Sequence, residues 1–231
     1  MKLKMRFVKK MLIFAALAFN FSLILAQSPV NLRTIRFAVW AELDVYPGLY
    51  EKSDDMLSYT RTRIKDLSEF LMEGMVYGWK FVYTPSDKVR GVEEYLEVIP
   101  ELAFTEQDKA KIRYSDQFFE ENKVTVWCEY ERTDYQIQNY KLWSGIQNPV
   151  IKGRGLGKIS DGFEGIENAA KNALKEAVRA RYRAEIKNKP KEISGSVLIR
   201  NPPLVGITEG QYAIFLDFFL ERDRIIKYTT Y

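Results

Sequence analysis

Residues 150–159 (VIKGRGLGKI) and 160–187 (SDGFEGIENAAKNALKEAVRARYRAEIK) decide how this chain folds. The first stretch predicts a strand interrupted by glycines. The second predicts a helix that Ser160-Asp161 can cap and that runs to about Lys187 before Pro190. Mostly apolar and small residues recur along the helix at spacings of three and four and form one stripe: Phe163, Ile166, Ala169, Ala170, Ala173, Leu174, Ala177, Val178 and Arg181-Tyr182. Because this stripe is rich in alanine, the helix can lie close to the surface on which it packs.

The N-terminal part of the chain shows the same order of elements. Residues 34–43 (TIRFAVWAEL) predict a strand, and Ser53-Asp54-Asp55 predicts a helix cap. Behind that cap, apolar residues at spacings of three, four and seven predict an amphipathic helix that ends near Gly78: Leu57, Ile64, Leu67, Leu71 and Met75. Two further strands are predicted over residues 79–84 and 94–99, and each is stopped by a proline.

The middle of the chain is rich in strand-forming residues. Residues 111–120 and 123–132 flank Glu121-Asn122 and predict a β-hairpin. Apolar and polar residues alternate in the second run, so we expect Cys128 on the apolar side, as a small buried residue rather than a reactive thiol. Residues 134–143 (DYQIQNYKLW) fit a helix as well as a strand.

The C-terminal part of the chain again predicts strands. They lie over residues 192–200 and 211–221, separated by a Pro202-Pro203 loop, with a further short strand over residues 225–228.

Two amphipathic helices with one apolar stripe each need an apolar sheet face to cover. The predicted fold is therefore α+β and two-layered: a largely antiparallel sheet with two long amphipathic helices packed on one face. We expect a single domain over residues 27–231, with β-α-β-β halves at 34–100 and 149–221 and the hairpin at 111–132 between them. Two separate subdomains are the alternative, and the shared order leaves open whether the halves are a duplication.

The first 26 residues have the composition of a secretory signal peptide. Five cations precede an apolar run over residues 11–25, and Ala26 is a small residue at the cleavage position. An apolar run of about 15 residues is shorter than the roughly 20 that cross a bilayer, which favours cleavage over an uncleaved membrane anchor. We therefore expect an exported protein, periplasmic or extracellular, with no membrane span after signal cleavage.

Composition excludes several classes of function. The chain of 231 residues has no histidine and one cysteine, which excludes a Ser-His-Asp or Cys-His centre, a His-ligated zinc site and an internal disulfide. Without the five leader cations, 30 basic residues face 31 acidic ones, so the formal charge is −1 rather than +4. This balance removes the electrostatic support for a nucleic-acid partner, and none is expected.

The remaining motifs that could take part in catalysis or ligand binding are better explained by a structural role. The run from Gly153 to Gly157 precedes a helix but lacks the spacing of either phosphate-binding motif, and glycines in a strand permit a bulge or a close helix approach. Acid pairs occur at Glu93-Glu94, Glu120-Glu121 and Glu129/Glu131. Sequence neighbours do not supply the opposed carboxylates that a hydrolase needs, so we expect solvated surface. We expect no catalytic residue, no metal site and no cofactor.

Aromatic residues cluster between positions 127 and 143, interleaved with cations and amides. Aromatic side chains anchor many interfaces, so this cluster predicts an interaction surface for a glycan, a peptide or another subunit. The residues assigned to that surface are Tyr135, Tyr140, Trp143 and Arg132. The alternative is that half of the aromatic side chains fill the core of a β-rich segment.

Four features in residues 150–220 occur in a recognisable order. They are the glycine-containing strand, an alanine-studded helix (ENAAKNALKEAVRARYR), a strand of the form I-x-G-x-V at Ile193, Gly195 and Val197, and a terminal strand opened by a tyrosine (QYAIFLDFFL). In this order the segment resembles exported bacterial envelope domains, which include small outer-membrane lipoproteins and flagellar accessory proteins of the basal-disk and T-ring type. The chain departs from the lipoproteins because no lipid-acceptor cysteine follows its leader.

The resemblance implies a non-catalytic structural or assembly protein of the periplasm or envelope, with envelope or flagellar proteins as partners. It carries no catalytic residues across. The alternative function is a periplasmic ligand-binding module for glycan or peptide that uses the aromatic surface.

Overall fold

The computed structural model of this protein describes residues 31–44 and 57–228, and residues Arg33–Tyr231 form one compact unit. The predicted signal peptide and the predicted cap at Ser53-Asp54-Asp55 lie outside the described residues. The described elements follow in order: β1 (Thr34–Glu42), α2 (Ser58–Val76), β2 (Trp79–Thr84), β3 (Tyr95–Pro100), α3 (Glu106–Lys109), β4 (Arg113–Glu120), β5 (Lys123–Glu131), α4 (Asp134–Trp143), β6 (Val150–Lys158), the short 3₁₀ turn η1 (Ile159–Asp161), α5 (Phe163–Glu185), β7 (Glu192–Ile199), β8 (Leu204–Thr208) and β9 (Gln211–Ile226).

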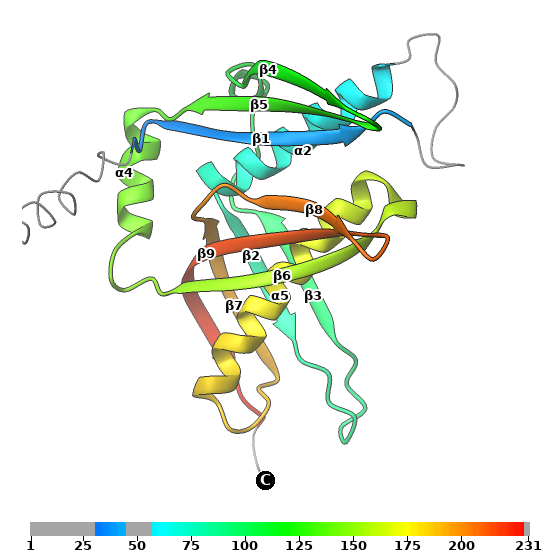
Figure 1. Ribbon diagram of the computed structural model, residues 1–231. Helices are drawn as coiled ribbons and strands as arrows, with labels where there is room; N and C mark the ends of the chain where they lie inside the picture. The colour runs from blue at the N-terminus through cyan, green and yellow to red at the C-terminus, as the bar shows by residue number, and fades with distance from the viewer. Residues whose placement is uncertain (1–30, 45–56, 229–231) are drawn as a thin grey trace, which may run out of the picture. The chain divides into compact units, whose positions relative to one another are not determined.

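The strands form two antiparallel sheets (Figure 1). One sheet has three strands in the order β1-β5-β4, and the other has six, in the order β3-β2-β7-β9-β6 with β8 also paired to β9. The long strand β9 has β6 along one edge, and β7 and β8 follow one another along the opposite edge. The predicted α+β class with largely antiparallel pairing is confirmed, although the strands divide between two sheets.

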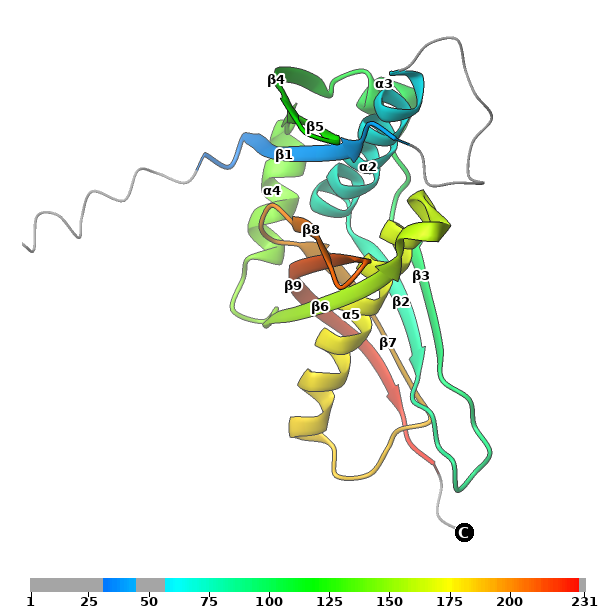
Figure 2. The same cartoon turned by 45° about the vertical axis from the view of Figure 1, so that its right-hand side comes forward.

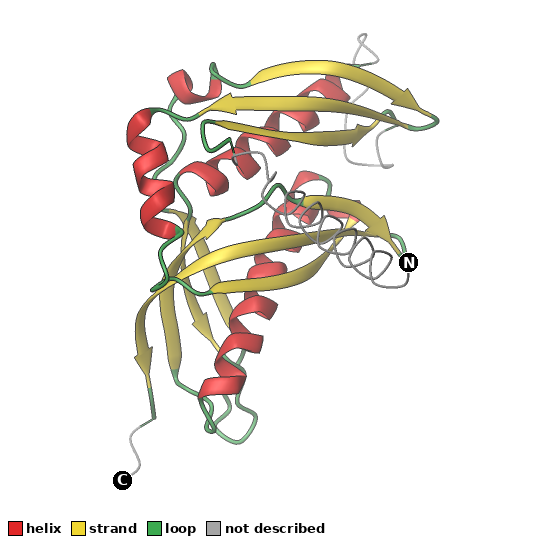
Figure 3. Ribbon diagram, turned by 60° about the vertical axis from the view of Figure 1, so that its left-hand side comes forward, coloured by secondary structure: helices red, strands yellow, loops and turns green. Residues whose placement is uncertain are grey.

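Each long helix packs mainly on its own sheet (Figure 3). The helix α2 covers the face of β1 and β5 that carries the buried residues Phe37, Val39 and Val126, and it also reaches β7. The helix α5 packs on β6 and β9.

Both long helices also reach one face of the six-stranded sheet, because a Cβ atom at Gly74 of α2 would lie 2.7 Å from Trp79 and Ile199. Tyr83 and Ile193, which lie an even number of residues away along the same strands and so on the same face, lie beside α5. The sequence did not predict the second sheet, which forms because β1 pairs with the hairpin strand β5 and not with β2.

The contact between α5 and β6 is unusually close. A Cβ atom added at Gly153, Gly155 or Gly157 would lie 1.9, 1.9 and 1.8 Å from a backbone carbonyl oxygen of α5, belonging in turn to Ala173, Ala169 and Gly165. Alternate residues of a strand are about 6.6 Å apart, and residues four apart on a helix are about 6.0 Å apart. Each strand glycine therefore meets one small helix residue, which confirms the close helix approach predicted from the glycines and the alanine stripe.

The helix boundaries differ from prediction at one cap. Ser160 and Asp161 do not cap α5: they lie in the turn η1, and the Ser160 hydroxyl lies 3.0 Å from the Asp161 carboxylate. The helix begins at Phe163, after Gly162 at a φ of 59°. The end of α2 is as expected, because Gly78 has a φ of 84° and a Cβ there would lie 2.4 Å from the carbonyl oxygen of Val197.

The sequence pattern did not predict the secondary structure of three segments. Residues 134–143, which fitted two structures, form the helix α4. The strand β8 occupies part of the predicted Pro202-Pro203 loop region, and Ile225 belongs to β9 rather than to a separate strand. The short helix α3 was not predicted.

We predict that Gly155→Ala lowers the free energy of unfolding by about 3 kcal/mol or more, because the new methyl group would overlap the α5 backbone. The matched control is Gly206→Ala in β8, where an added Cβ has no neighbour within 4 Å. It should be neutral or stabilise by up to about 1 kcal/mol. Urea denaturation of both variants measures the difference, and equal midpoints would contradict the close α5–β6 contact.

Candidate functional site

The predicted aromatic surface is centred on α4, and the structure divides its members between surface and core. Tyr135 is 78% exposed, but Trp143 is only 8% exposed and packs with Leu198 and Phe219 of the six-stranded sheet. Tyr140 is partly buried. Its ring meets Phe219 edge-on at 5.7 Å, and its hydroxyl donates to the carbonyl oxygen of Arg200 at 3.4 Å. Two of these three aromatic residues therefore fasten α4 to the sheet.

Arg132 also lies inside the protein. It is 5% exposed, its Nη2 donates to the carbonyl oxygen of Met75 at 3.1 Å, and its guanidinium carbon lies 4.5 Å from the centre of the Tyr140 ring. Burial lowers the pKa of its guanidinium. The assignment of Arg132 and Trp143 to an exposed surface was therefore wrong, because both side chains are buried. Tyr135 is largely accessible to a partner, and Tyr140 is accessible in part.

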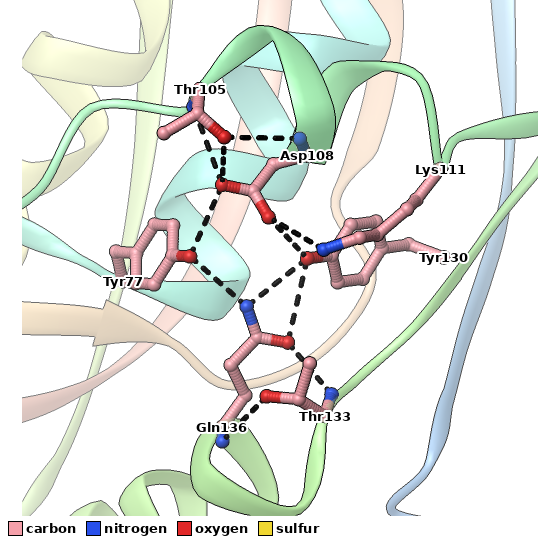
Figure 4. A network of polar contacts seen from close by, with 7 residues as sticks. All are labelled: Tyr77, Thr105, Asp108, Lys111, Tyr130, Thr133 and Gln136. Carbon is pink, nitrogen blue, oxygen red and sulfur yellow. Dashed lines mark hydrogen bonds and ion pairs between the residues drawn. The ribbon is translucent and has the colours of Figure 1, made fainter.

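A buried polar network joins four elements at the other end of α4 (Figure 4). Two helix N-termini, those of α3 and α4, each carry a reciprocal capping box, Thr105 with Asp108 and Thr133 with Gln136. The hydroxyls of Tyr77 and Tyr130 bridge the two boxes. Each donates to the Asp108 carboxylate, at 3.3 and 3.2 Å, and each accepts from the Gln136 amide, at 3.1 and 3.0 Å.

The negative charge of Asp108 in this network is balanced by the ammonium group of Lys111. Burial disfavours the ionised form of Asp108, but the Thr105 hydroxyl at 2.8 Å and the Lys111 ammonium at 3.1 Å outweigh that effect and lower the pKa of the carboxyl. Burial raises the pKa of Tyr130 to about 12, so its hydroxyl stays protonated and keeps its donor. With its groups mutually satisfied, the network acts as a structural joint and leaves no group poised for chemistry.

A different region has the form of a binding site. A cleft of about 770 Å³ lies between the end of the three-stranded sheet and β8, and we name it the edge cleft. It is lined by Trp40, Glu42, Glu120, Glu121, Asn122, Lys123, Val205, Gly206 and Ile207. The strands β1 and β8 lie next to each other in Figure 1 and Figure 2, and the Trp40 indole N–H bridges them by donating to the carbonyl oxygen of Val205 at 2.9 Å.

The edge cleft has unpaired strand edges on both sides. Among the described strands, β1 pairs only with β5 and β8 pairs only with β9. The Val205 carbonyl faces β1, so the backbone groups of Ile207, two residues further on, point to the same side. The Glu42 carbonyl accepts from the Thr60 hydroxyl and therefore points away from β5, which places the backbone groups of Trp40 on the same free edge.

Carboxylates dominate the edge cleft. Glu42, Glu120 and Glu121 face a single cation, Lys123, which pairs with Glu120 at 2.8 Å. Glu42 is held in place because it accepts from the Tyr212 hydroxyl at 2.8 Å, and Tyr212 accepts in turn from buried Arg63 at 3.4 Å. Burial, reinforced by the bond to Glu42, raises the pKa of Tyr212. An aromatic ring, an apolar strand edge and excess negative charge suit a cationic or amphipathic ligand.

The other residues that the sequence singled out as candidates for chemistry are ion-paired on the surface or buried in the core. Glu129 and Glu131 form ion pairs with Arg36 and Arg113 on the outer face of the three-stranded sheet. Cys128 is fully buried, its thiol contacts the Phe37 carbonyl oxygen at 3.2 Å, and burial raises its pKa to about 12. In the part of the chain that the structure describes, no group of three or more acidic or cysteine side chains is arranged to hold a metal ion.

Short sequence patterns mark parts of the polar network and of the edge cleft. The pattern Thr-x-x-Gln at Thr133 and Gln136 is a capping box that would have identified α4 as a helix. Glu120-Glu121 is visible in the sequence as an acid pair, but nothing local links it to Trp40 or Ile207, because the edge cleft forms only when two sheets meet.

We predict that Asp108→Asn destabilises the protein by about 1–3 kcal/mol at neutral pH, because it removes a buried charge that accepts four kinds of donor. Since the folded state lowers the pKa of Asp108, its contribution is present above the ordinary carboxyl pKa of about 3.9 and is lost as the pH falls below it. The gap between wild type and variant should therefore shrink on acidification. Asp134→Asn, at an 86% exposed carboxylate, is the control and should stay within about 1 kcal/mol. A gap that persists unchanged at acid pH would contradict this role.

Comparison with known proteins gives a relative whose function is not described. An uncharacterized protein of Treponema pallidum (strain Nichols) is 25% identical over 199 residues, which cover 86% of this chain and 83% of that protein. No solved structure matches the chain. Within the described residues, no helix is long and apolar enough to cross a membrane. A family model matches residues 23–228, and the chain therefore belongs to that family, whose type is uncharacterised.

Proposed function

We propose that this protein is an exported, non-catalytic envelope protein that acts in assembly by binding an extended segment of a partner protein in the edge cleft. The observation that carries this proposal is a pair of strand edges, one on β1 and one on β8, that carry no partner strand among the described residues and line the same cleft from two different sheets. An extended segment placed there would receive backbone hydrogen bonds from the outward groups of Ile207 and Trp40.

Side chains around the edge cleft indicate which segment fits. Trp40 and Ile207 offer apolar contact, and Ile207 is 50% exposed on β8. Glu42, Glu120 and Glu121 favour cations on the opposing side chains. The partner segment is therefore extended, with basic residues alternating with apolar ones. The signal-like leader and the resemblance to envelope and flagellar accessory domains support a periplasmic setting for this partner.

We predict that a photoreactive group in place of Ile207, in cells that export the protein, forms a crosslink to a defined envelope protein. Glu120→Lys in the same chain should reduce that crosslink about tenfold, because one reversed charge near a bound cation is worth about 1.4 kcal/mol or more. The matched control is Glu97→Lys on the exposed side of β3, which should leave the crosslink intact.

A photoreactive group at Val89, which is 95% exposed and lies outside the edge cleft, measures random contact. Equal crosslinking from Val89 and Ile207, or none from Ile207, would reject the edge cleft as the docking site. A crosslink to a glycan rather than a protein would support the ligand-binding alternative, since Trp40 with carboxylates also suits a sugar.

In vitro, we predict that a synthetic peptide of alternating lysine and valine binds the chain and protects the backbone amides of β1 and β8 from hydrogen exchange. The same peptide with glutamate in place of lysine should bind at least about tenfold more weakly. Protection of β3 or β4 instead would show that a different edge receives the strand. If the peptide adds as a strand at the free edge of β8, only alternate amides of β8 gain a hydrogen bond. The gain in protection on binding should therefore be larger at Ile207 than at Gly206.

A further inference from the structure

A second concave site lies beside the C-terminal half of α5. This half is the lower end of the helix in Figure 1. The site has a volume of about 270 Å³, and we name it the basic pocket. It is bounded by α5, by the segment that follows α5 and by the ends of β2 and β7. No residue that lines the basic pocket also lines the edge cleft.

The floor of the basic pocket is apolar and fixed. Tyr83, Tyr182 and Ile193 line it, and they are 2%, 4% and 1% exposed. Side chains as deeply packed as these keep one position, so the pocket is formed before any ligand arrives.

The rim of the basic pocket is cationic. Arg179, Arg183, Lys187 and Lys189 line it together with a single carboxylate, that of Glu94. Arg179 and Arg183 are one turn apart on α5 and so lie on the same face. The Lys189 ammonium is held over the opening because it donates to the carbonyl oxygen of Ser86 at 2.7 Å.

Carboxylates compensate only part of this charge: Arg179 pairs with Glu176 at 2.8 Å, and Glu94 is already engaged with Arg179 and Lys175. The Glu94 carboxylate accepts from the Tyr83 hydroxyl at 2.8 Å and pairs with Lys175 at 3.1 Å and with Arg179 at 3.9 Å. Burial opposes ionisation of Glu94, but the bonds from Tyr83 and Lys175 outweigh it and lower the pKa of the carboxyl. Among the described residues, no carboxylate lies within ion-pair distance of Arg183 or Lys187, although both line the pocket.

We propose that the basic pocket binds the phosphate group of a phosphate ester, either a small soluble ester or a lipid headgroup. A phosphate offers several acceptor oxygens and up to two negative charges, which matches Arg183, Lys187 and Lys189 better than a carboxylate does. The Arg183 guanidinium can bind two phosphate oxygens at once, while the lysines act as point charges. The apolar floor accommodates the carbon chain that carries the ester.

The test uses the full mature chain and two probes. One probe is glycerol phosphate in solution, followed by calorimetry. The other is vesicles of phosphatidylcholine with and without phosphatidylglycerol, followed by co-sedimentation. The variant Arg183→Gln with Lys187→Gln removes two exposed cations and should weaken binding of the preferred probe at least about tenfold.

The matched control is Lys65→Gln with Lys141→Gln, which removes the same charge from exposed sites outside the pocket and should bind as wild type does. The swap Arg183→Lys with Lys187→Arg keeps the charge and should retain most of the binding. Loss of glycerol phosphate binding in the first variant identifies a soluble ester, and loss of vesicle binding alone identifies a lipid headgroup. Binding of neither probe by the wild-type chain, or equal weakening by the control, would overturn the proposal.

Discussion

The glycines of β6 and the small residues of α5 let the helix backbone lie directly against the strand, and this contact positions most of the fold. With carbonyl oxygens of α5 less than 2 Å from where a Cβ would lie, no other residue fits at Gly153, Gly155 or Gly157 without moving the helix. The position of β6 sets that of β9, and β9 carries β7 and β8 along its other edge. One side of the edge cleft and the floor of the basic pocket are thus both built outward from this contact.

Local pattern predicted the elements well and their partners less well. The strands at residues 34–42 and 79–84, the hairpin and both long helices follow directly from alternation, helical spacing and the glycine at position 78. Pairing was harder, because β1 has the same alternation whether it joins β2 or β5. It pairs with β5, which lies far along the chain, and α2 packs on both strands.

The same difficulty explains the sites. The cluster around Tyr135, Tyr140, Trp143 and Arg132 was identified correctly as a local group, but sequence could not say which members face the sheet. An aromatic side chain on a helix packs inward or outward according to the surface beneath it, and here Phe219 and Leu198 provide that surface. The edge cleft has no local signal, since its lining comes from β1, the β4–β5 turn and β8.

The bridge between the two capping boxes has a consequence for the order in which the protein opens. Neither α3, with four residues, nor α4, with ten, is long enough to be stable alone. Each begins with a capping box, and the third helical residue of each box, Asp108 or Gln136, is bonded to the hydroxyls of Tyr77, at the C-terminal end of α2, and Tyr130 of β5. If either helix unfolds, the polar groups that it shares with the other helix lose hydrogen-bond partners. We therefore expect the two helices to open as one cooperative unit and to exchange their amide hydrogens together, although 24 residues separate the end of the first from the start of the second.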